Sequence, residues 1–328
     1  MAGTVKQSGK IVKEYLAKYP NLPNLTLAKK IFKENKLQFA TVETVRTCLR
    51  MYRGKIGIKN KNSTADKSFF NQKIEFKMPE SYAETFDAYE IKQSRILILS
   101  DLHFPYQDNK AIQLAINYGK EKGVNCILIN GDLIDFATIS RHERDWRHRS
   151  VAVEFNAVRE FLQELRKHFP KAKIVFKEGN HDERWEKWLF LKAPEIFDDV
   201  EFKLETRLRL GELHIDIVKD KLPVKIGKLN VLHGHELQGG GGVNPARATF
   251  LKTIDNVLIG HCHRTSQHTE PTFGGNVIVT TSQGCLCGMY PMFARVNKWN
   301  LGFSFVELDI KTGNYRLDNL KIINNQVF

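Results

Sequence analysis

Five short motifs rich in aspartate, histidine and asparagine are spread over the sequence, and each follows an apolar run. They are Asp101-Leu102-His103, Gly131-Asp132-Leu133-Ile134-Asp135, Gly179-Asn180-His181-Asp182, His233-Gly234-His235 and Gly260-His261-Cys262-His263. Short apolar runs of this kind are typical of buried strands, and open α/β folds place their functional sites at the carboxyl ends of strands. We therefore expect these polar side chains to meet at one edge of a sheet.

The side chains in these motifs are ligands for divalent metal ions. Carboxylate and amide oxygens combined with imidazole nitrogens suit Mn²⁺, Fe²⁺ or Zn²⁺ better than Ca²⁺. The five motifs hold enough donors for two ions that share one carboxylate. Two ions roughly 3.5–4 Å apart can clamp the attacking and leaving oxygens of a phosphoryl transfer. One Asp-x-His or His-x-His pair is weak evidence, but five motifs in this order after apolar runs are specific.

Strands and helices that would position the motifs alternate along the chain from residue 94. Apolar runs predict strands at residues 95–100, 126–130, 173–177, 229–232 and 257–259, and helical periodicity covers 110–120 and 154–168. Later strands, which look antiparallel, are expected at residues 276–281, 302–308 and 315–322. This pattern predicts an α/β layered domain with a mixed sheet.

The first 60 residues are strongly basic. They carry 10 Lys and 3 Arg against 3 Glu and no Asp, so they hold +10 of the net charge of +13. Helical periodicity covers residues 8–19, 25–34 and 41–53. The third helix carries Arg46, Arg50 and Arg53 on or beside the face opposite its apolar stripe. This is the outline of a helix-turn-helix module and favours a nucleic-acid partner, although many small three-helix units bind nothing.

The composition of the whole chain is globular. Of its 328 residues, 42% are hydrophobic and 27% are charged, which excludes a wholly disordered, collagen-like or coiled-coil protein. No apolar run approaches the roughly 18 residues of a membrane span, and the N-terminus lacks the apolar core of an export signal. Five scattered cysteines argue against a disulfide framework. We expect a cytoplasmic protein with no membrane partner.

The motif set resembles that of the calcineurin-like metallophosphoesterase superfamily, over roughly residues 94–265. The resemblance implies a two-sheet β-sandwich flanked by helices. It also implies two divalent metal ions per chain, with Mn²⁺ favoured and Fe²⁺ or Zn²⁺ as alternatives, and water or hydroxide between them as the nucleophile. The implied ligands are Asp101, His103 and His263 for one ion, Asn180, His233 and His261 for the other, and Asp132 bridging both.

The same resemblance implies two catalytic roles. His181 matches the histidine that protonates the leaving oxygen, and Asp135 matches the carboxylate that orients it. Protein phosphatases of this family usually have an arginine after the second motif and glutamate in the third. Here Phe136-Ala137 follows Asp135 and the third motif ends in Asp182, so a protein phosphatase is less favoured but stays open.

Residues near the motifs are candidates for substrate binding. Arg141, Arg144 and Arg147 follow the second motif, and the alternatives are a phosphate-backbone groove and a solvated helix face. His235 has no metal assigned to it and is expected behind the ligands or near the substrate. The glycine-rich segment 239–247 indicates a loop, and strand alternation predicts that Cys262 points away from the ligands into the packing.

We expect a helical nucleic-acid-binding domain at residues 1–58, a linker at 59–92 and a metallophosphoesterase domain at 93–328. Both domains would share one substrate class if the enzyme hydrolyses phosphodiester bonds in nucleic acid or nucleotides. Two alternatives stay open. One is a phosphomonoesterase acting on nucleotides or phosphoproteins, and the other is a non-catalytic DNA-binding scaffold, which the presence of both His181 and Asp135 disfavours.

Overall fold

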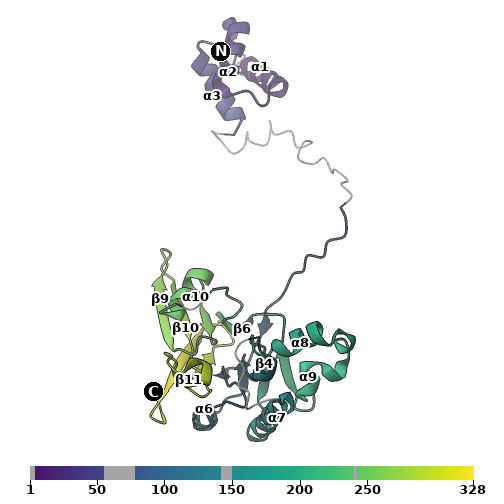
Figure 1. The fold of residues 1–328 in the computed structure, drawn as a ribbon. Coiled ribbons are helices and arrows are strands. Elements are labelled where there is room, and N and C mark those ends of the chain that lie inside the picture. Colours follow the sequence, from purple (N-terminus) through teal and green to yellow (C-terminus); the bar gives the residue numbers. More distant parts are fainter. Residues whose placement is uncertain (1–3, 55–77, 142–149, 240–241) are drawn as a thin grey trace. The chain divides into compact units, whose positions relative to one another are not determined.

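The chain consists of two units, residues 1–83 and residues 84–328, in a computed structural model that describes residues 4–54, 78–141, 150–239 and 242–328 (Figure 1). None of the helices in these described ranges has the length and apolarity needed to span a bilayer.

Residues 4–54 of the first unit form a small helical bundle. Its helices are α1 (Thr4–Lys18), α2 (Asn24–Glu34) and α3 (Val42–Tyr52), with a 3₁₀ turn at Lys36–Gln38. Val12, Ile31 and Leu49, one from each helix, are fully buried in a shared core. The amphipathic periodicity therefore places the helices as expected, and the predicted N-terminal helical region is confirmed.

The described part of the second unit contains two sheets. The seven-stranded sheet has the order β13 (Gln326–Val327), β12 (Tyr315–Ile323), β11 (Leu301–Leu308), β2 (Arg95–Leu99), β3 (Cys126–Asn130), β4 (Lys173–Lys177), β5 (Ile215–Val218). The strands from β2 to β5 are parallel, and β11 pairs antiparallel with β2. The six-stranded sheet has the order β1 (Tyr89–Glu90), β6 (Val224–Ile226), β7 (Leu229–Leu232), β8 (Val257–Ile259), β10 (Val277–Ser282), β9 (Ser266–Pro271).

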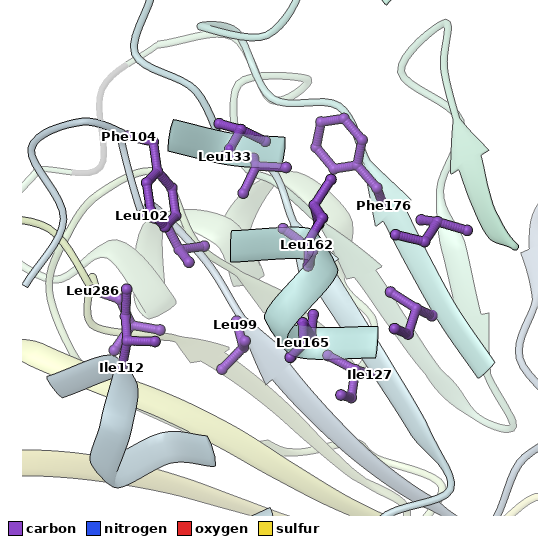
Figure 2. Close-up of a cluster of buried hydrophobic side chains, with 14 of the residues drawn as sticks. Leu99, Leu102, Phe104, Ile112, Ile127, Leu133, Leu162, Leu165, Phe176 and Leu286 are labelled. Carbon is purple, nitrogen blue, oxygen red and sulfur yellow. The ribbon is translucent and has the colours of Figure 1, made fainter. Parts of the chain in front are cut away.

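Alternation along the strands builds two cores. Ile96 and Ile98 of β2 face the other sheet and pack in one buried cluster with Val231 and Leu258. Their neighbours Leu97 and Leu99 point to the opposite face, toward α6 (Asn109–Glu121) and α7 (Val151–His168). Figure 2 shows this second core, in which side chains from the strands and from these helices meet.

Shorter helices complete the layers. The second unit also holds α8 (Arg184–Lys192), α9 (Leu204–Arg207) and α10 (Pro245–Thr253), together with 3₁₀ turns at Ala137–Ile139, Pro194–Ile196, Val200–Phe202 and Met292–Ala294. Helix α10 lies on the six-stranded sheet, where Thr280 Oγ1 donates to the carbonyl oxygen of Ala246 at 2.8 Å. The predicted two-sheet sandwich flanked by helices is confirmed.

The structure differs from two expectations about connecting segments. Strand β1 lies inside the predicted linker, pairs with β6 and is followed by Ile91, which is 2% exposed. The second unit therefore begins before residue 93. The predicted loop at 239–247 is wrong for its last residues, because Asn244 caps α10 by accepting a hydrogen bond from the Arg247 N–H at 3.1 Å.

Candidate metal centre

Topology brings the five motifs to one place. They follow β2, β3 and β4, which are neighbours in one sheet, and β7 and β8, which are neighbours in the other. Nε2 of His103 lies 3.2 Å from Nε2 of His263, although the two residues are 160 positions apart in the sequence. The carboxyl ends of strands from both sheets therefore share one site.

The first group of donors surrounds His263. Its Nε2 lies 3.2 Å from Oδ1 of Asp101 and 3.2 Å from Nε2 of His103. Because metal–ligand bonds are about 2.0–2.2 Å long, donors of one ion lie roughly 3–4 Å apart. Both distances from Nε2 of His263 have that spacing, which is compatible with the assignment of His263, Asp101 and His103 to one ion by the family resemblance.

The second group is linked to the first through Asp132. Its Oδ2 lies 3.6 Å from Nε2 of His103 and 3.3 Å from Nε2 of His233, as a bridging carboxylate requires. The His261 ring lies beside that of His233, with ring centroids 5.2 Å apart. Asp132, His233 and His261 have donor atoms close enough to hold one ion.

Two buried polar atoms test whether a metal fits here. In the described ranges, Oδ1 of Asn180 and Nε2 of His233 are buried and have no hydrogen-bond partner. Leaving such atoms unpaired is costly, and native proteins rarely do so. An ion in the second group would satisfy both atoms, so the residues fit a metal.

The candidate ligands adopt an unusual backbone conformation. Five of them have left-handed φ values between 51° and 61°, namely Asp101, His103, Asp132, His261 and His263. Residues other than glycine rarely adopt this conformation, which costs on the order of 1–3 kcal/mol each and is concentrated at functional sites. Because the backbone turns here, strand alternation does not apply to Cys262. It is half-buried and lines a cavity, so the prediction that it points into the packing is wrong.

Buried acids hold the motif loops in place. Oδ2 of Asp182 accepts from the backbone N–H of Asp132 at 2.7 Å and of Gly179 at 2.8 Å, which joins the second motif to the third. Glu236 accepts from the backbone N–H of His233 and forms an ion pair with buried Lys177 at 2.7 Å. Lys177 and Glu236 belong to none of the five motifs, so the sequence analysis did not identify them.

In the second group, the pKa values of two histidines are shifted in opposite directions. Burial lowers the pKa of His261 to about 4, so its imidazole is neutral and ready to bind a metal. For His233, burial opposes protonation, but the carboxylates of Asp132 and Asp101 outweigh it and raise the pKa to about 10. An ion that binds His233 must therefore displace a proton.

The candidate catalytic pair lies next to the ligands. Nδ1 of His181 is 3.0 Å from Oδ1 of Asp135, and its Nε2 is 3.9 Å from Oδ2 of Asp132. Arg184 places Nη2 2.9 Å from Nε2 of His181 and donates through Nη1 to the Asp135 carbonyl oxygen. The sequence analysis did not identify Arg184 as a site residue. Its position, four residues after Asn180 and at the start of a helix, could have indicated that it lies near the metal centre.

Two further residues contact the His263 ring and were not predicted. Sγ of Cys287 lies 3.9 Å from Nδ1 of His263, the ring nitrogen that does not face Asp101. The Trp299 ring packs edge-on against His263, with centroids 4.2 Å apart. Cys287 therefore contacts the His263 ring at Nδ1, and Trp299 packs against the ring.

Of the predicted substrate-binding residues, the structure describes Arg141 and His235, and neither lies among the candidate metal ligands. Arg141 is exposed and outside the cavity described below, while Arg144 and Arg147 fall outside the described residues. Nε2 of His235 lies 2.9 Å from Oε1 of Glu183, so His235 supports the loop behind the ligands.

In the first unit, the three arginines of α3 have different partners. Arg53 donates to Asn24 Oδ1 at 2.8 Å and to the Pro20 carbonyl oxygen at 2.9 Å, so it ties the end of α3 to the start of α2. Arg46 and Arg50 share Glu43, at 3.2 and 3.7 Å.

The metal centre opens into a cavity of about 770 Å³. On the side of the catalytic pair, the wall includes Ala137, Ser140 and Arg184. The other wall comes from one segment and consists of Gly288, Tyr290, Pro291, Met292, Phe293, Arg295 and Trp299.

The sequence was compared with protein-family models and with known proteins. The family model for calcineurin-like phosphoesterases matches residues 94–283. The Gene 54 protein of Mycobacterium phage L5 is 28% identical over 234 residues, which are 66% of this chain and 89% of that protein.

Solved structures with a similar fold include a Vps29 single mutant from Entamoeba histolytica, with 14% identity, a TM-score of 0.38, and 71% of this chain and 96% of that chain covered. Another is the phosphoesterase Yfce from E. coli, with 16% identity, a TM-score of 0.32, and coverages of 69% and 98%. The family match spans more than half of the chain and contains all five motifs. This chain therefore belongs to the calcineurin-like phosphoesterase family and is a metal-dependent phosphoesterase.

Proposed function

We propose that this protein hydrolyses phosphodiester bonds in nucleic acid. The observation that carries the proposal is the wall of the large cavity, which combines aromatic rings with positive charge beside the metal centre. A phosphomonoester would occupy the metal centre and leave most of a 770 Å³ cavity unfilled.

The aromatic rings form a row that leads away from the ligands. Trp299 contacts His263, and the Phe293 ring follows with its centroid 6.4 Å from that of Trp299. Phe293 is 63% exposed and nearby Tyr290 is 67% exposed, so both present free apolar surface. Exposed rings next to cations are typical of single-stranded nucleic-acid sites, where bases stack at about 1–3 kcal/mol each.

Positive charge lies on both walls of the same cavity. Arg184 lies beside the catalytic pair, and Arg295 lies in the aromatic segment. Planar guanidinium groups suit phosphate oxygens, because they bind them through two parallel hydrogen bonds. A nucleotide on each side of the scissile phosphate would have both charge and stacking surface available.

The residues of the site fit general acid catalysis. When bound, the two ions lower the pKa of a water molecule and offset the negative charge of the phosphate. His181 would donate a proton from Nε2 to the leaving oxygen, while Asp135 holds the opposite ring nitrogen and stabilises the imidazolium. Arg184, now 2.9 Å from Nε2, would move to a non-bridging phosphate oxygen when substrate enters.

We extend the proposal to the first unit, as a nucleic-acid-binding module that supplies substrate to the metal centre. Its support is the +10 charge of the first 60 residues and the position of Arg46 and Arg50 on α3, the helix that follows the turn. Arg53 contributes less to binding in this proposal, because both of its Nη atoms already donate within the unit.

A substrate panel tests the proposed function. Purified protein loaded with Mn²⁺ is assayed on a bis-aryl phosphate, an aryl monophosphate, and single- and double-stranded DNA and RNA, with Asp132→Asn as the inactive control. We expect hydrolysis of the diester and of nucleic acid to exceed that of the monoester. Preference for the monoester would support a phosphomonoesterase, and binding of DNA without any hydrolysis would support a scaffold.

A further inference from the structure

A second cavity of about 330 Å³ lies beside the first. It is lined by the segment after β7, by α10 and by the residues next to the last metal motif. His261 and Trp299 line both cavities. The two cavities are therefore adjacent, and the small one lies next to a candidate metal ligand.

The small cavity is positively charged. Lys252, Arg264 and Lys298 line it, and no aspartate or glutamate is among its lining residues in the described part of the chain. Lys252 donates to the carbonyl oxygen of Gly239 at 3.0 Å, and Arg264 donates to those of Gly242 and Val243 at 2.6 and 2.9 Å. Neutral carbonyl groups hold these cations in position and leave their charge uncompensated, which favours an anion.

The remaining lining of the small cavity is mostly apolar. Leu237, Pro245, Ile259 and Trp299 contribute carbon surface next to the three cations. Such a mixture matches a sugar-phosphate unit, in which a charged phosphate is joined to a largely apolar ribose face. An isolated inorganic anion would use the cations and leave the apolar part uncovered.

We propose that this cavity binds the phosphate that flanks the scissile bond in a nucleic-acid strand. The proposal rests on the proposed function and narrows its substrate to strands that carry a second phosphate next to the one attacked. Lys252, Arg264 and Lys298 are then residues that select a strand over an isolated phosphodiester, without touching the reacting atoms. A nucleotide with a phosphate chain offers similar chemistry, and the test separates the two sources.

The test compares thymidine dinucleotides that differ by one phosphate. One has only the internucleotide phosphate, and two others carry an additional terminal phosphate at the 5′ or the 3′ end. We expect the wild-type protein to hydrolyse one of the latter about tenfold faster in kcat/KM, since one charge-assisted contact contributes about that factor. The double variant Lys252→Gln/Lys298→Gln should lose this gain and keep its activity on the dinucleotide without a terminal phosphate. Lys321→Gln, on an exposed position of β12, is the matched control.

Equilibrium binding of the same dinucleotides gives a readout that does not depend on hydrolysis. We expect the terminal phosphate to tighten binding to the wild-type protein and not to the double variant. Equal losses on all three dinucleotides, or no gain from either terminal phosphate in binding and rate, would overturn the proposal. If phosphate-dependent binding is seen without hydrolysis of any dinucleotide, the cavity assignment stands and the proposed function fails. Tighter binding of thymidine triphosphate than of the phosphorylated dinucleotides would assign the cavity to the phosphate chain of a nucleotide. That result would overturn the proposal that the cavity binds a nucleic-acid strand.

Discussion

Oδ1 of Asp135 lies 3.0 Å from Nδ1 of His181, and the same oxygen lies 2.8 Å from Nδ1 of His103. One carboxylate therefore fixes the ring of the candidate acid and the ring of a candidate metal ligand. Burial opposes ionisation of Asp135, but hydrogen bonds from the two histidines outweigh it and hold its pKa well below the ordinary value. The carboxylate stays charged and couples the acid to the metal site.

Replacement of the acid should change the rate and not the metal content. His181→Ala is expected to lower kcat by about 10²–10⁴-fold on esters with poor leaving groups, and by much less on aryl esters that leave without protonation. Asp135→Asn should show the same dependence and also weaken metal binding, because His103 loses its partner. An equal loss on good and poor leaving groups would mean that His181 positions the substrate instead.

The bridging carboxylate should be the most sensitive ligand. Asp132→Asn is expected to remove both ions and all activity, because Oδ2 of Asp132 is close to His103 and to His233. Asp101→Asn should weaken mainly one ion. Elemental analysis of the purified proteins measures this, with Asp198→Asn at an exposed position as control. Wild-type protein should lose activity in a chelator, and active protein with fewer than two ions per chain would contradict the dinuclear centre.

A single added methyl group at Gly179 should displace the bridging carboxylate. A Cβ there would lie 2.3 Å from Oδ1 and 2.4 Å from the backbone N of Asp132, distances at which one of them must move. Gly179→Ala is therefore expected to lower metal content and activity. At Gly211 an added Cβ meets nothing within 4 Å, so Gly211→Ala is the control, and identical behaviour of the two variants would disprove the steric argument.

Stability should depend on pH through Glu154, a buried residue of α7. Burial, helped by the charge of Asp135, raises its pKa to about 7, whereas an unfolded glutamate titrates near 4.3. Folding therefore favours the protonated acid, and the free energy of unfolding falls as the pH rises from about 4 to 7. Glu154→Gln removes this penalty, so it should exceed the wild type in stability by about 1–3 kcal/mol at pH 8. At pH 4 the difference should vanish, and thermal unfolding at both pH values checks this.

The first unit should affect the binding and hydrolysis of long substrates only. Deleting residues 1–58 is expected to reduce binding and cleavage of long nucleic acid and to leave hydrolysis of a small aryl diester near normal, since every candidate ligand lies beyond residue 100. Binding of duplex DNA should weaken by roughly 0.9 in log K per log salt for each phosphate contact. Arg46→Ala combined with Arg50→Ala should flatten this slope.

Arg53→Ala is the contrasting variant in the same unit. It should lower the thermal stability of the unit, because it removes the bonds to Asn24 and Pro20, with little change in the salt dependence. A truncated protein that binds and cuts long nucleic acid as well as the whole chain would refute the role of the first unit.

The parts of the fold that could be predicted are those with a local signal. Strands β2, β3 and β4 are continuous apolar runs, because both faces of each strand are covered, and their limits matched the prediction to within one residue. Strand β9, Ser266–Pro271, is mostly exposed at the edge of its sheet. Its residues are polar, so nothing in the sequence distinguishes it from a loop.

In the candidate site, too, the predictable residues are those with a local signal in the sequence. The five motifs were visible because each ligand follows a strand at a short distance. Trp299 and the Lys177–Glu236 pair were not, since their partners are set by tertiary contacts between distant segments. The bond from Arg184 to the Asp135 carbonyl oxygen likewise joins two segments that are far apart in the sequence. The left-handed backbone at the ligands was also beyond prediction, because this conformation is uncommon for every residue other than glycine.

The last motif completes both ion sites at once. The first group lacks a ligand until His263 is present, and the second lacks one until His261 is present, two residues earlier. Ribosomes add roughly 5–20 residues per second, so the 160 residues from His103 to His263 take on the order of ten seconds or more. Throughout that interval the growing chain has neither ion site complete, and then gains both almost together. A newly made molecule therefore cannot hydrolyse a phosphoester before its chain has been synthesised as far as residue 263.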